Sequence, residues 1–280
     1  MKFFIANAIL FFLLTASITF FQVQENSSDK RVQYELSEIK DSTSIVFHKA
    51  YTLNYNEKYE QAEWAAYLLT KEMITKENAR KNDFREDTLV ATKSAKPSDY
   101  IRSGYDKGHL VPAADMGINK VIMSESFYMS NMSPQKPGFN RGIWKRLEEK
   151  VRQFAAENDS LFIATGPVLN EDTLESKQKI KFERIGKNKV AVPHLYYKVV
   201  AVYKHSGIHK GIGFLVANNP SNEDLEKFAV PIDSIEVITG INFFEKIPKA
   251  IQDKIEREQN LNEWFCGTEK KQKSAKVSRN

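Results

Sequence analysis

The sequence predicts an α+β fold, with a mainly antiparallel central sheet flanked by helices. Three observations indicate this class. Helical and strand-like segments are mixed without regular βαβ alternation, the strand-like runs are β-branched or aromatic and separated by polar turns, and the Rossmann and P-loop glycine patterns are absent. The 280-residue chain is 41% hydrophobic without an apolar-poor middle, so we expect one catalytic-sized domain, placed over residues 46–266.

The N-terminal segment has the layout of an export signal. In residues 1–23, Lys2 precedes an almost uninterrupted apolar run that ends in a polar stretch. The run from Phe3 to Phe21 is also about long enough to span a bilayer, and its small residues form no clean cleavage site. We therefore expect a secreted or periplasmic protein, with a membrane anchor as the alternative. Residues 24–45 are expected to form a loose polar lead-in.

The net charge is weak evidence for a polyanionic partner. The chain carries +5, but its tail, residues 267–280, holds four lysines and one arginine against one glutamate. That tail contributes +4, so residues 1–266 carry only +1, and a solvated, disordered tail accounts for most of the charge. Phosphate binding by the domain therefore has to come from local groups of residues. The single cysteine, Cys266, excludes an internal disulfide.

The first part of the domain predicts a strand, a helix and a long connection. Residues 44–56, SIVFHKAYTLNYN, are rich in β-branched and aromatic residues and predict a strand that carries His48. Residues 57–73 predict a helix because apolar side chains recur at helical spacing, at Tyr59, Ala62, Ala66, Leu69 and Met73. The polar residues 74–106 predict a long surface connection, a kind of segment that often carries function.

The second part predicts one strong helix and then strands. In residues 138–158 a core stripe recurs every three or four residues, at Ile143, Leu147, Val151 and Phe154. Residues 160–169, 189–204 and 210–219 are strand-like runs separated by turns. Residues 230–244 predict a strand or loop, and residues 246–260 predict a last helix.

The motif Asp106-Lys107-Gly108-His109 crowds an acid, a base, a glycine and a histidine into four positions. A positioned histidine is the usual general base near physiological pH, while Asp106 could fix the loop and Lys107 could meet an anionic substrate. The alternative is an ordinary turn, because Asp-x-Gly sequences are common in loops.

Two further segments follow this motif in order. Ser130-Asn131-Met132-Ser133-Pro134-Gln135 comes next, and then Asn140-Arg141-Gly142 opens the strong helix that carries Glu148. Together the three segments resemble the DNA/RNA non-specific endonucleases, whose ββα-metal (His-Me finger) site has an Asp-Arg-Gly-His motif, a Ser-Asn-x-x-Pro-Gln segment and a helix opened by Asn-x-Gly. The resemblance covers about residues 46–244. The sequence departs from the family pattern at two positions. Lys107 replaces the family arginine and lacks its bidentate guanidinium fork. His194 directly follows Pro193, unlike the histidine of the family, and therefore receives no role by analogy.

The chemistry of phosphodiester hydrolysis assigns roles to these residues. His109 suits the activation of water, and a hard divalent cation suits charge stabilisation and help for the departing oxygen. We expect Mg²⁺, with Mn²⁺ as the alternative. The amide oxygen of Asn140 is the expected direct ligand. Glu148 lies eight residues further, about 12 Å along an ideal helix, so we expect it to hold the metal through water, in agreement with the family's usual account.

Five further residues are candidate substrate contacts. Asn140, Trp144, Glu148 and Arg152 sit four apart on a helix face next to the core stripe and are expected to face a cleft. The alternative for Glu148 and Arg152 is a surface ion pair, and Asn131 and Gln135 could instead hold the loop. Upstream, Arg80 is preferred as a phosphate ligand, with Arg85 as its competitor. The candidates are Arg80, Lys107, Asn131, Gln135 and Arg152.

The sequence therefore predicts an exported, Mg²⁺-dependent, sugar-non-specific endonuclease that cuts DNA and RNA. Contacts confined to the phosphate backbone imply little sequence preference. Two alternatives are a catalytically silent polyanion-binding protein of the same fold and a phosphodiesterase that acts on another anionic substrate.

Overall fold

The computed structural model describes the chain except for residues 1–32, 76–79, 81, 172–180, 205–206 and 266–280. The chain divides into two units, residues 1–33 and 34–280, and the description below concerns the second. The expected export signal, the basic tail and Cys266 lie outside the described residues. Among the described helices none is long and apolar enough to cross a membrane.

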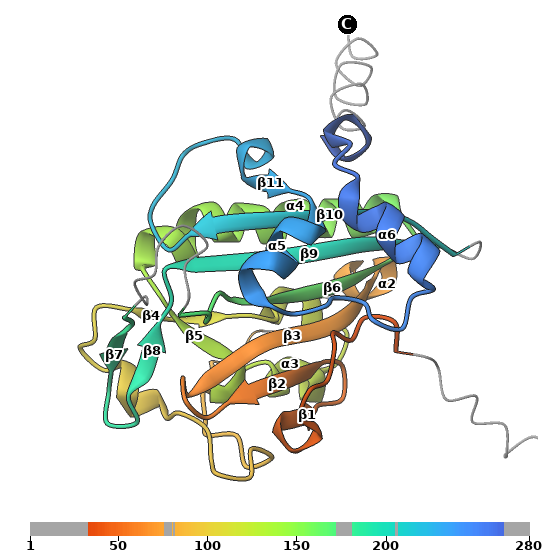
Figure 1. Cartoon of the computed structure of the whole chain (residues 1–280). Helices are drawn as coiled ribbons and strands as arrows, with labels where there is room; N and C mark the ends of the chain where they lie inside the picture. The colour runs from red at the N-terminus through yellow and green to blue at the C-terminus, as the bar shows by residue number, and fades with distance from the viewer. Residues whose placement is uncertain (1–32, 76–79, 81, 172–180, 205–206, 266–280) are drawn as a thin grey trace, which may run out of the picture. The chain divides into compact units, whose positions relative to one another are not determined.

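A seven-stranded antiparallel sheet forms the centre of the domain (Figure 1), as the sequence predicted. Its order is β1-β2-β3-β6-β9-β10-β11, and every neighbouring pair is antiparallel. Its strands are β1 (Ile45–Phe47), β2 (Thr52–Asn56), β3 (Gln61–Thr70), β6 (Ser160–Pro167), β9 (Leu195–Lys204), β10 (Gly207–Ala217) and β11 (Ala229–Val230). A separate hairpin pairs β7 (Glu183–Ile185) with β8 (Val190–Val192).

The predicted helix over residues 57–73 is wrong. Most of this segment is β3, which pairs with β2 and β6, and only its last residues enter the short helix α2 (Lys71–Thr75). Both faces of β3 are buried, because Trp64 and Ala66 pack in one core while Tyr67 and Leu69 pack in the other. A strand covered on both faces is apolar at nearly every position, so its period of two is hidden.

Two other segments also differ from expectation. Residues 44–56 form two strands instead of one, and His48 lies in the turn between β1 and β2, where its backbone N–H donates to the Tyr51 carbonyl. Residues 230–244 contain a helix, α5 (Ile232–Thr239), rather than a strand. Its β-branched residues favoured a strand, but Gly240 ends the helix with φ +71° and donates to the Glu236 carbonyl, as a helix C-terminus requires.

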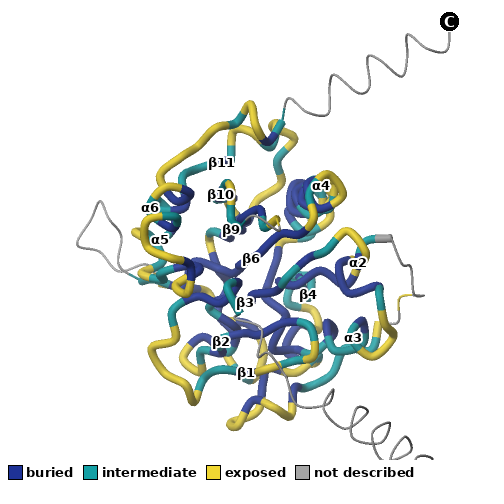
Figure 2. The backbone as a smooth tube through the Cα atoms, turned by 90° about the vertical axis from the view of Figure 1, so that its right-hand side faces the viewer, coloured by how far each residue is buried: buried dark blue, intermediate teal, exposed yellow. Residues whose placement is uncertain are grey.

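Helices cover both faces of the sheet (Figure 2), and the strand side chains alternate between two cores. On β6, Leu161 and Ile163 belong to the core beneath α4 (Lys145–Glu157), whereas Phe162 and Ala164 belong to the core beneath α5 and α6 (Lys249–Arg257). Helix α2 contacts α4 on the first face. The predicted strong helix and the predicted last helix are both present. The remaining elements are α3 (Lys120–Glu125) and the 3₁₀ turns η1 (Ser42–Ser44), η2 (Pro97–Tyr100), η3 (Ala113–Met116), η4 (Met129–Asn131) and η6 (Leu225–Phe228).

The expected loose and surface segments are partly packed. Residues 34–45 were expected within a loose lead-in, yet Leu36 is buried and the Glu38 N–H donates to the Asn242 carbonyl at 2.8 Å. The long connection has little regular structure between residues 82 and 105, but Asp87, Asp99 and Tyr100 are buried in it. Asp99 accepts hydrogen bonds from Lys96 and Asn188, which explains how an irregular segment holds its course.

Candidate active site

The site is built on a second antiparallel hairpin, β4 (Asp106–His109) with β5 (Met132–Gln135). Asp106 pairs with Gln135 and His109 with Met132, and the chain then enters the helical segment η5 (Phe139–Trp144) and α4. Two strands followed by a helix is the expected ββα arrangement. Gly108 is required here, because a Cβ at this position would stand 2.1 Å from the Gln135 Cδ.

The hairpin forms its own two-stranded sheet and is joined to the seven-stranded sheet by side chains. The Ser133 hydroxyl donates to the Gln61 side-chain oxygen on β3. The Tyr196 hydroxyl on β9 lies 2.6 Å from the Ser133 hydroxyl and donates to the Pro134 carbonyl at 2.8 Å. These buried contacts fix the hairpin on the face of the sheet that carries α4.

The helix begins with an irregular turn. η5 has π-helical hydrogen bonding, and Gly142 within it has non-helical dihedrals, φ −105° and ψ −108°. The predicted core stripe is confirmed, because Ile143, Leu147, Val151 and Phe154 are all buried. Trp144 was predicted to face the cleft, and this prediction is wrong. It is buried and stacks on Phe139, because the turn at Gly142 breaks the regular four-residue spacing.

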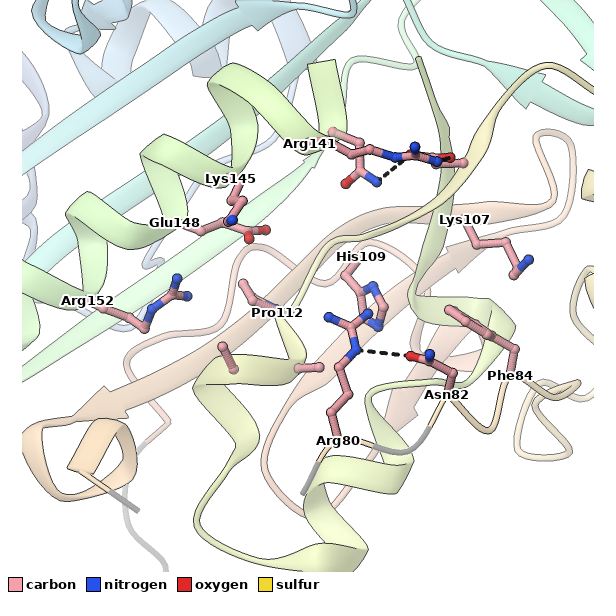
Figure 3. Close-up of a pocket in the computed structure, with 14 residues that line it drawn as sticks. Arg80, Asn82, Phe84, Lys107, His109, Pro112, Arg141, Lys145, Glu148 and Arg152 are labelled. Atoms are coloured by element: carbon pink, nitrogen blue, oxygen red, sulfur yellow. Dashed lines mark hydrogen bonds and ion pairs between the residues drawn. The ribbon is translucent and has the colours of Figure 1, made fainter. Parts of the chain in front are cut away.

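A cavity of about 570 Å³ opens between the hairpin, α4 and the segment around Arg80 (Figure 3). Six of the eight predicted site residues line it, although they come from distant parts of the chain: Arg80, Lys107, His109, Asn140, Glu148 and Arg152. Asn131 and Gln135 do not. Asp106, which was expected to fix the loop, also lines the cavity. The remaining lining residues had no predicted role: Asn82, Phe84, Pro112, Ala113, Ala114, Arg141 and Lys145.

His109 sits against aromatic rings at the base of the cavity. Its ring meets Phe127 edge-on at 4.9 Å between centroids and lies 5.8 Å from Phe84. Its Nε2 is buried and has no hydrogen-bond partner in the described part of the chain. Burial, with the nearby charge of Arg80, lowers the pKa of His109 to about 3. The imidazole is therefore neutral at physiological pH and able to accept a proton.

Asp106 holds Asn140 in a defined orientation. The Asn140 Nδ2 donates to Asp106 Oδ2 at 2.9 Å, and Arg141 donates to both carboxylate oxygens, at 2.9 and 2.7 Å. Burial raises the pKa of Asp106, but the hydrogen bonds from Arg141 and Asn140 outweigh it and leave the pKa below its usual value. With its amide nitrogen tied to Asp106, Asn140 keeps its side-chain oxygen for another ligand.

Glu148 is partly buried and lies among several charges. Burial raises the pKa of Glu148 to about 7, against the opposing charge of Lys198. The surface ion pair considered for Glu148 and Arg152 is not formed. Arg152 instead donates to Asp115 at 2.9 Å, and Asp115 is buried and also accepts from the Tyr67 hydroxyl. Asp115 thereby fixes the Arg152 guanidinium at the cavity wall.

Lys198 is a residue that sequence reasoning missed. It is fully buried on β9, where its Nζ donates to Thr165 Oγ1 at 3.1 Å and lies 5.0 Å from the Trp144 ring centroid. Burial lowers the pKa of Lys198 to about 8, and the charges of Glu148 and Asp115 oppose that shift. The signal in the sequence was a single lysine inside the apolar run LYYKVVAV, at a position predicted to be a buried strand.

Asn131 and Gln135 are buried and do not line the cavity. The Asn131 side chain accepts from the Val111 N–H and donates to the carbonyls of Val111 and Ser126, and it is fully buried. Gln135 is buried over Gly108, and both its amide atoms are without hydrogen-bond partners among the described residues. The geometry thus agrees with the loop-holding alternative for Asn131.

Arg80 and Arg85, the two upstream candidates, have different surroundings. Arg80 lines the cavity beside His109 (Figure 3), with its Nε donating to Asn82 at 3.0 Å. Arg85 donates to Asp83 and the Ser124 carbonyl and stacks on Tyr128 at 3.9 Å, and it does not line the cavity. Arg80 is therefore the better placed of the two to meet a phosphate.

The donor set of the cavity fits a hard cation and an anionic substrate. The Asn140 oxygen and the Glu148 carboxylate are oxygen donors of the type that Mg²⁺ prefers. Besides Arg141, which is bound to Asp106, four cations line the cavity and could meet phosphate oxygens: Arg80, Lys107, Lys145 and Arg152.

Comparisons with known proteins identify relatives of this chain. The profile of a family described as DNA/RNA non-specific endonuclease matches residues 28–250. The chain is 35% identical to human "Endonuclease G, mitochondrial" over 204 residues, covering 71% of this chain and 69% of that protein. It is 36% identical to the Saccharomyces cerevisiae "Mitochondrial nuclease" over 220 residues, covering 74% and 67%. A Nostoc "Nuclease" is 31% identical over 224 residues, covering 76% and 77%.

A solved structure is also similar to this chain. A chain in the crystal structure of an EndoG/EndoGI complex superposes with a TM-score of 0.66 at 32% identity. The match covers 73% of this chain and 87% of that chain.

Proposed function

We propose that this chain, which belongs to the DNA/RNA non-specific endonuclease family, cuts both DNA and RNA with a bound Mg²⁺ ion and His109 as general base. Membership of the family makes the chain a nuclease, that is, a phosphodiester hydrolase. The metal, the role of each residue and the location of the protein are the proposal. The observation that supports it best is the position of His109, with its unpartnered Nε2, in the same cavity as the oriented Asn140.

His109 takes a proton from the attacking water. The neutral ring meets the first requirement of a base, and the aromatic contacts with Phe84 and Phe127 restrict its orientation. A pKa of about 3 is low for a base, but it belongs to the free site, where Arg80 and burial disfavour the protonated ring. A phosphodiester entering beside Arg80 brings a negative charge, which raises the pKa of His109 toward the working range.

Asn140 would hold the cation directly and Glu148 would hold it through water. Asp106 supports the first role, because it binds the Asn140 amide nitrogen and leaves the oxygen for the metal. A divalent cation bound there supplies charge stabilisation at the phosphate and assistance to the departing oxygen. Mn²⁺, which also favours oxygen ligands, is the alternative ion.

Arg80, Lys107 and Arg152 would contact the phosphate backbone. All three line the cavity, but they are held differently: Arg152 is bound by Asp115, whereas the Lys107 ammonium lies 4.8 Å from the Phe84 ring centroid. Lys107 acts as a point charge and lacks the bidentate geometry of an arginine. Because such contacts read no base edges, we expect cleavage with little sequence preference.

Export is proposed from the sequence of residues 1–23. The human and yeast relatives are named as mitochondrial, and the Nostoc relative is named only as a nuclease. Fusion of residues 1–45 to a reporter, followed by fractionation and N-terminal sequencing, distinguishes a cleaved signal from a membrane anchor. A reporter retained in the cytoplasm overturns export.

Nuclease assays on supercoiled plasmid and on RNA test the catalytic part. We expect cleavage of both with Mg²⁺, none with EDTA, and a loss of about 10² to 10⁴ in turnover for His109→Ala with nucleic-acid binding retained. Binding without cleavage by the native chain supports a catalytically silent polyanion-binding protein. Cleavage of only small phosphodiesters supports a phosphodiesterase that acts on another anionic substrate. Activity of His109→Ala within tenfold of native overturns the base assignment.

A further inference from the structure

Three carboxylates meet on the face of the sheet opposite the active site. Asp233 and Glu236 lie on α5, and Glu256 lies on α6, the neighbouring helix in Figure 1. One carboxylate oxygen from each residue lies within 4.8 Å of those from the other two. Their mutual repulsion has to be offset by protons or by a cation.

Glu256 is the distinctive member of this cluster. The residue is only 1% exposed, and its Oε1 is buried without a hydrogen-bond partner among the described residues. Burial, with the charge of Glu236, raises the pKa of Glu256 to about 8. A buried carboxylate beside two others, with one oxygen that accepts no hydrogen bond, needs a proton or a cation, and a bound cation would displace that proton.

The cations nearby do not fill this place. The Arg257 Nε lies 3.8 Å from Asp233 Oδ2, and both side chains are substantially exposed, so this pair is weak. The Lys249 ammonium is bound by Asp253 at 2.8 Å on the solvent side of α6. Neither cation makes an ion pair with Glu256 within the described part of the chain.

The segment between α5 and α6 holds one of the acids, Glu236, in place. Glu236 Oε1 accepts from the Phe243 N–H at 2.7 Å, which positions its carboxylate. Gln252, one turn before Glu256 on α6, donates to Asn242 and to the Phe243 carbonyl at 2.7 and 2.9 Å. The segment that links the two helices is therefore fixed to both of them, and the Glu236 carboxylate needs little ordering when an ion binds.

We propose that Asp233, Glu236 and Glu256 form a second, structural cation site that takes Ca²⁺ and ties α5 to α6. The ligands are oxygens only, as Ca²⁺ requires. Ca²⁺ binds oxygens at about 2.3–2.6 Å, so two ligands of one ion stand up to roughly 5 Å apart, which matches the spacing of these carboxylates. The site lies on the α5 and α6 side of the sheet and shares no residue with the cavity that contains His109.

Thermal unfolding and calorimetry with Ca²⁺ test the site in full-length protein that carries Asn140→Ala, which weakens binding at the active site. In this background Ca²⁺ at about a hundredfold over its Kd should raise the Tm by on the order of 5 °C. Adding Glu256→Gln should abolish the shift and the calorimetric signal. Adding Asp253→Asn, a matched change on the same helix outside the cluster, should leave both intact.

Two further variants make the result decisive. Asp233→Asn changes the more exposed side of the cluster and tests the site independently if Glu256→Gln fails to fold by circular dichroism. With native Asn140, Glu256→Gln should keep Mg²⁺-dependent plasmid cleavage within about twofold, because the cluster lies outside the active site. Equal Ca²⁺ shifts in the Glu256→Gln and Asp253→Asn proteins, or the absence of any Ca²⁺ shift in the Asn140→Ala protein, overturn the proposal.

Discussion

The carboxylate of Asp106 accepts a 2.9 Å hydrogen bond from the side-chain amide of Asn140, across the gap between β4 and the start of the helix. The same carboxylate binds the Arg141 guanidinium through both oxygens. The first residue of the histidine motif therefore orients the expected metal ligand, and the last residue is the expected base. One strand of four residues positions both parts of the chemistry.

Asp106→Ala should release Asn140 and lower the affinity for Mg²⁺. Loss of a residue that orients a metal ligand usually costs about 10- to 100-fold in metal affinity or activity. Mg²⁺ titration of plasmid nicking measures the effect. Arg141→Ala is the matched control, because it removes the exposed ion pair and leaves the Asn140 bond; a loss as large as that of Asp106→Ala would contradict the role given to the amide bond.

Asn140→Ala and Glu148→Gln should have different effects on metal affinity and activity. Asn140→Ala removes the proposed direct ligand, so metal affinity should fall sharply and excess Mg²⁺ should rescue only part of the activity. Glu148→Gln keeps the shape but loses the charge that holds metal-bound water, so a loss of about 10- to 100-fold is expected. Calorimetric Mg²⁺ titration of both variants decides. The two roles are reversed if Glu148→Gln abolishes metal binding and Asn140→Ala preserves it.

Lys198→Met should move the pH profile of cleavage. The Lys198 charge lowers the pKa of Glu148, which burial otherwise raises. Without that charge the Glu148 pKa rises further above 7, so a larger fraction of the carboxylate is protonated at neutral pH. Activity should fall near pH 7 and recover at higher pH.

Thr165→Val is the control for this variant, since it removes the hydrogen bond to the Lys198 ammonium but keeps the charge. Its pH profile should stay close to that of the native protein. A Lys198→Met profile that drops uniformly at every pH would mean that the lysine only supports packing.

His109 should make the protein less stable in mild acid. Its pKa falls from 6.5 to about 3 on folding, so between these values the unfolded chain binds more protons than the native chain. The stability contributed by the neutral ring is therefore present above about pH 6.5 and is lost as pH falls toward 3. Between pH 7 and pH 5 the loss is about 2 kcal/mol.

Urea unfolding of native and His109→Ala protein at pH 7 and pH 5 measures this contribution. Other groups titrate in the same range, but they are common to both proteins, so the difference between the two pH dependences isolates His109. Native protein should lose more stability on acidification than the variant does. Equal losses would show that His109 titrates normally in the folded state.

The active site was more predictable from the sequence than the elements around it. Asp106 to His109 and Asn140 to Glu148 are short motifs whose geometry is local, a hairpin strand and a helix start, so their order along the chain was sufficient. Arg152 was placed in the correct cavity, but no partner was predicted for it. Its partner Asp115 lies in a turn 37 residues earlier, and no pattern links the two positions.

The wrong or missing predictions, for β3, α5 and Lys198, have a common physical cause, because each of these features depends on tertiary packing. In β3, burial of both faces removed the alternation that identifies a strand, and the apolar spacing of Tyr59, Ala62 and Ala66 imitated a helix. In α5, β-branched residues concealed a helix that is stabilised by packing and by its Gly240 terminus. Lys198 was overlooked because its role depends on tertiary contact with residues from β6 and η5.

The attachment of the β4–β5 hairpin has an evolutionary consequence. Asn131, just before β5, is joined through three side-chain hydrogen bonds to Val111, just after β4, and to Ser126, and Ser133 and Tyr196 join the hairpin to the sheet without a shared backbone ladder. In the described part of the chain the finger is therefore held to the sheet through side chains rather than through strand pairing. Strands of the supporting sheet can therefore diverge at positions that carry neither an anchoring side chain, such as Tyr196, nor a charge beside the site, such as Lys198.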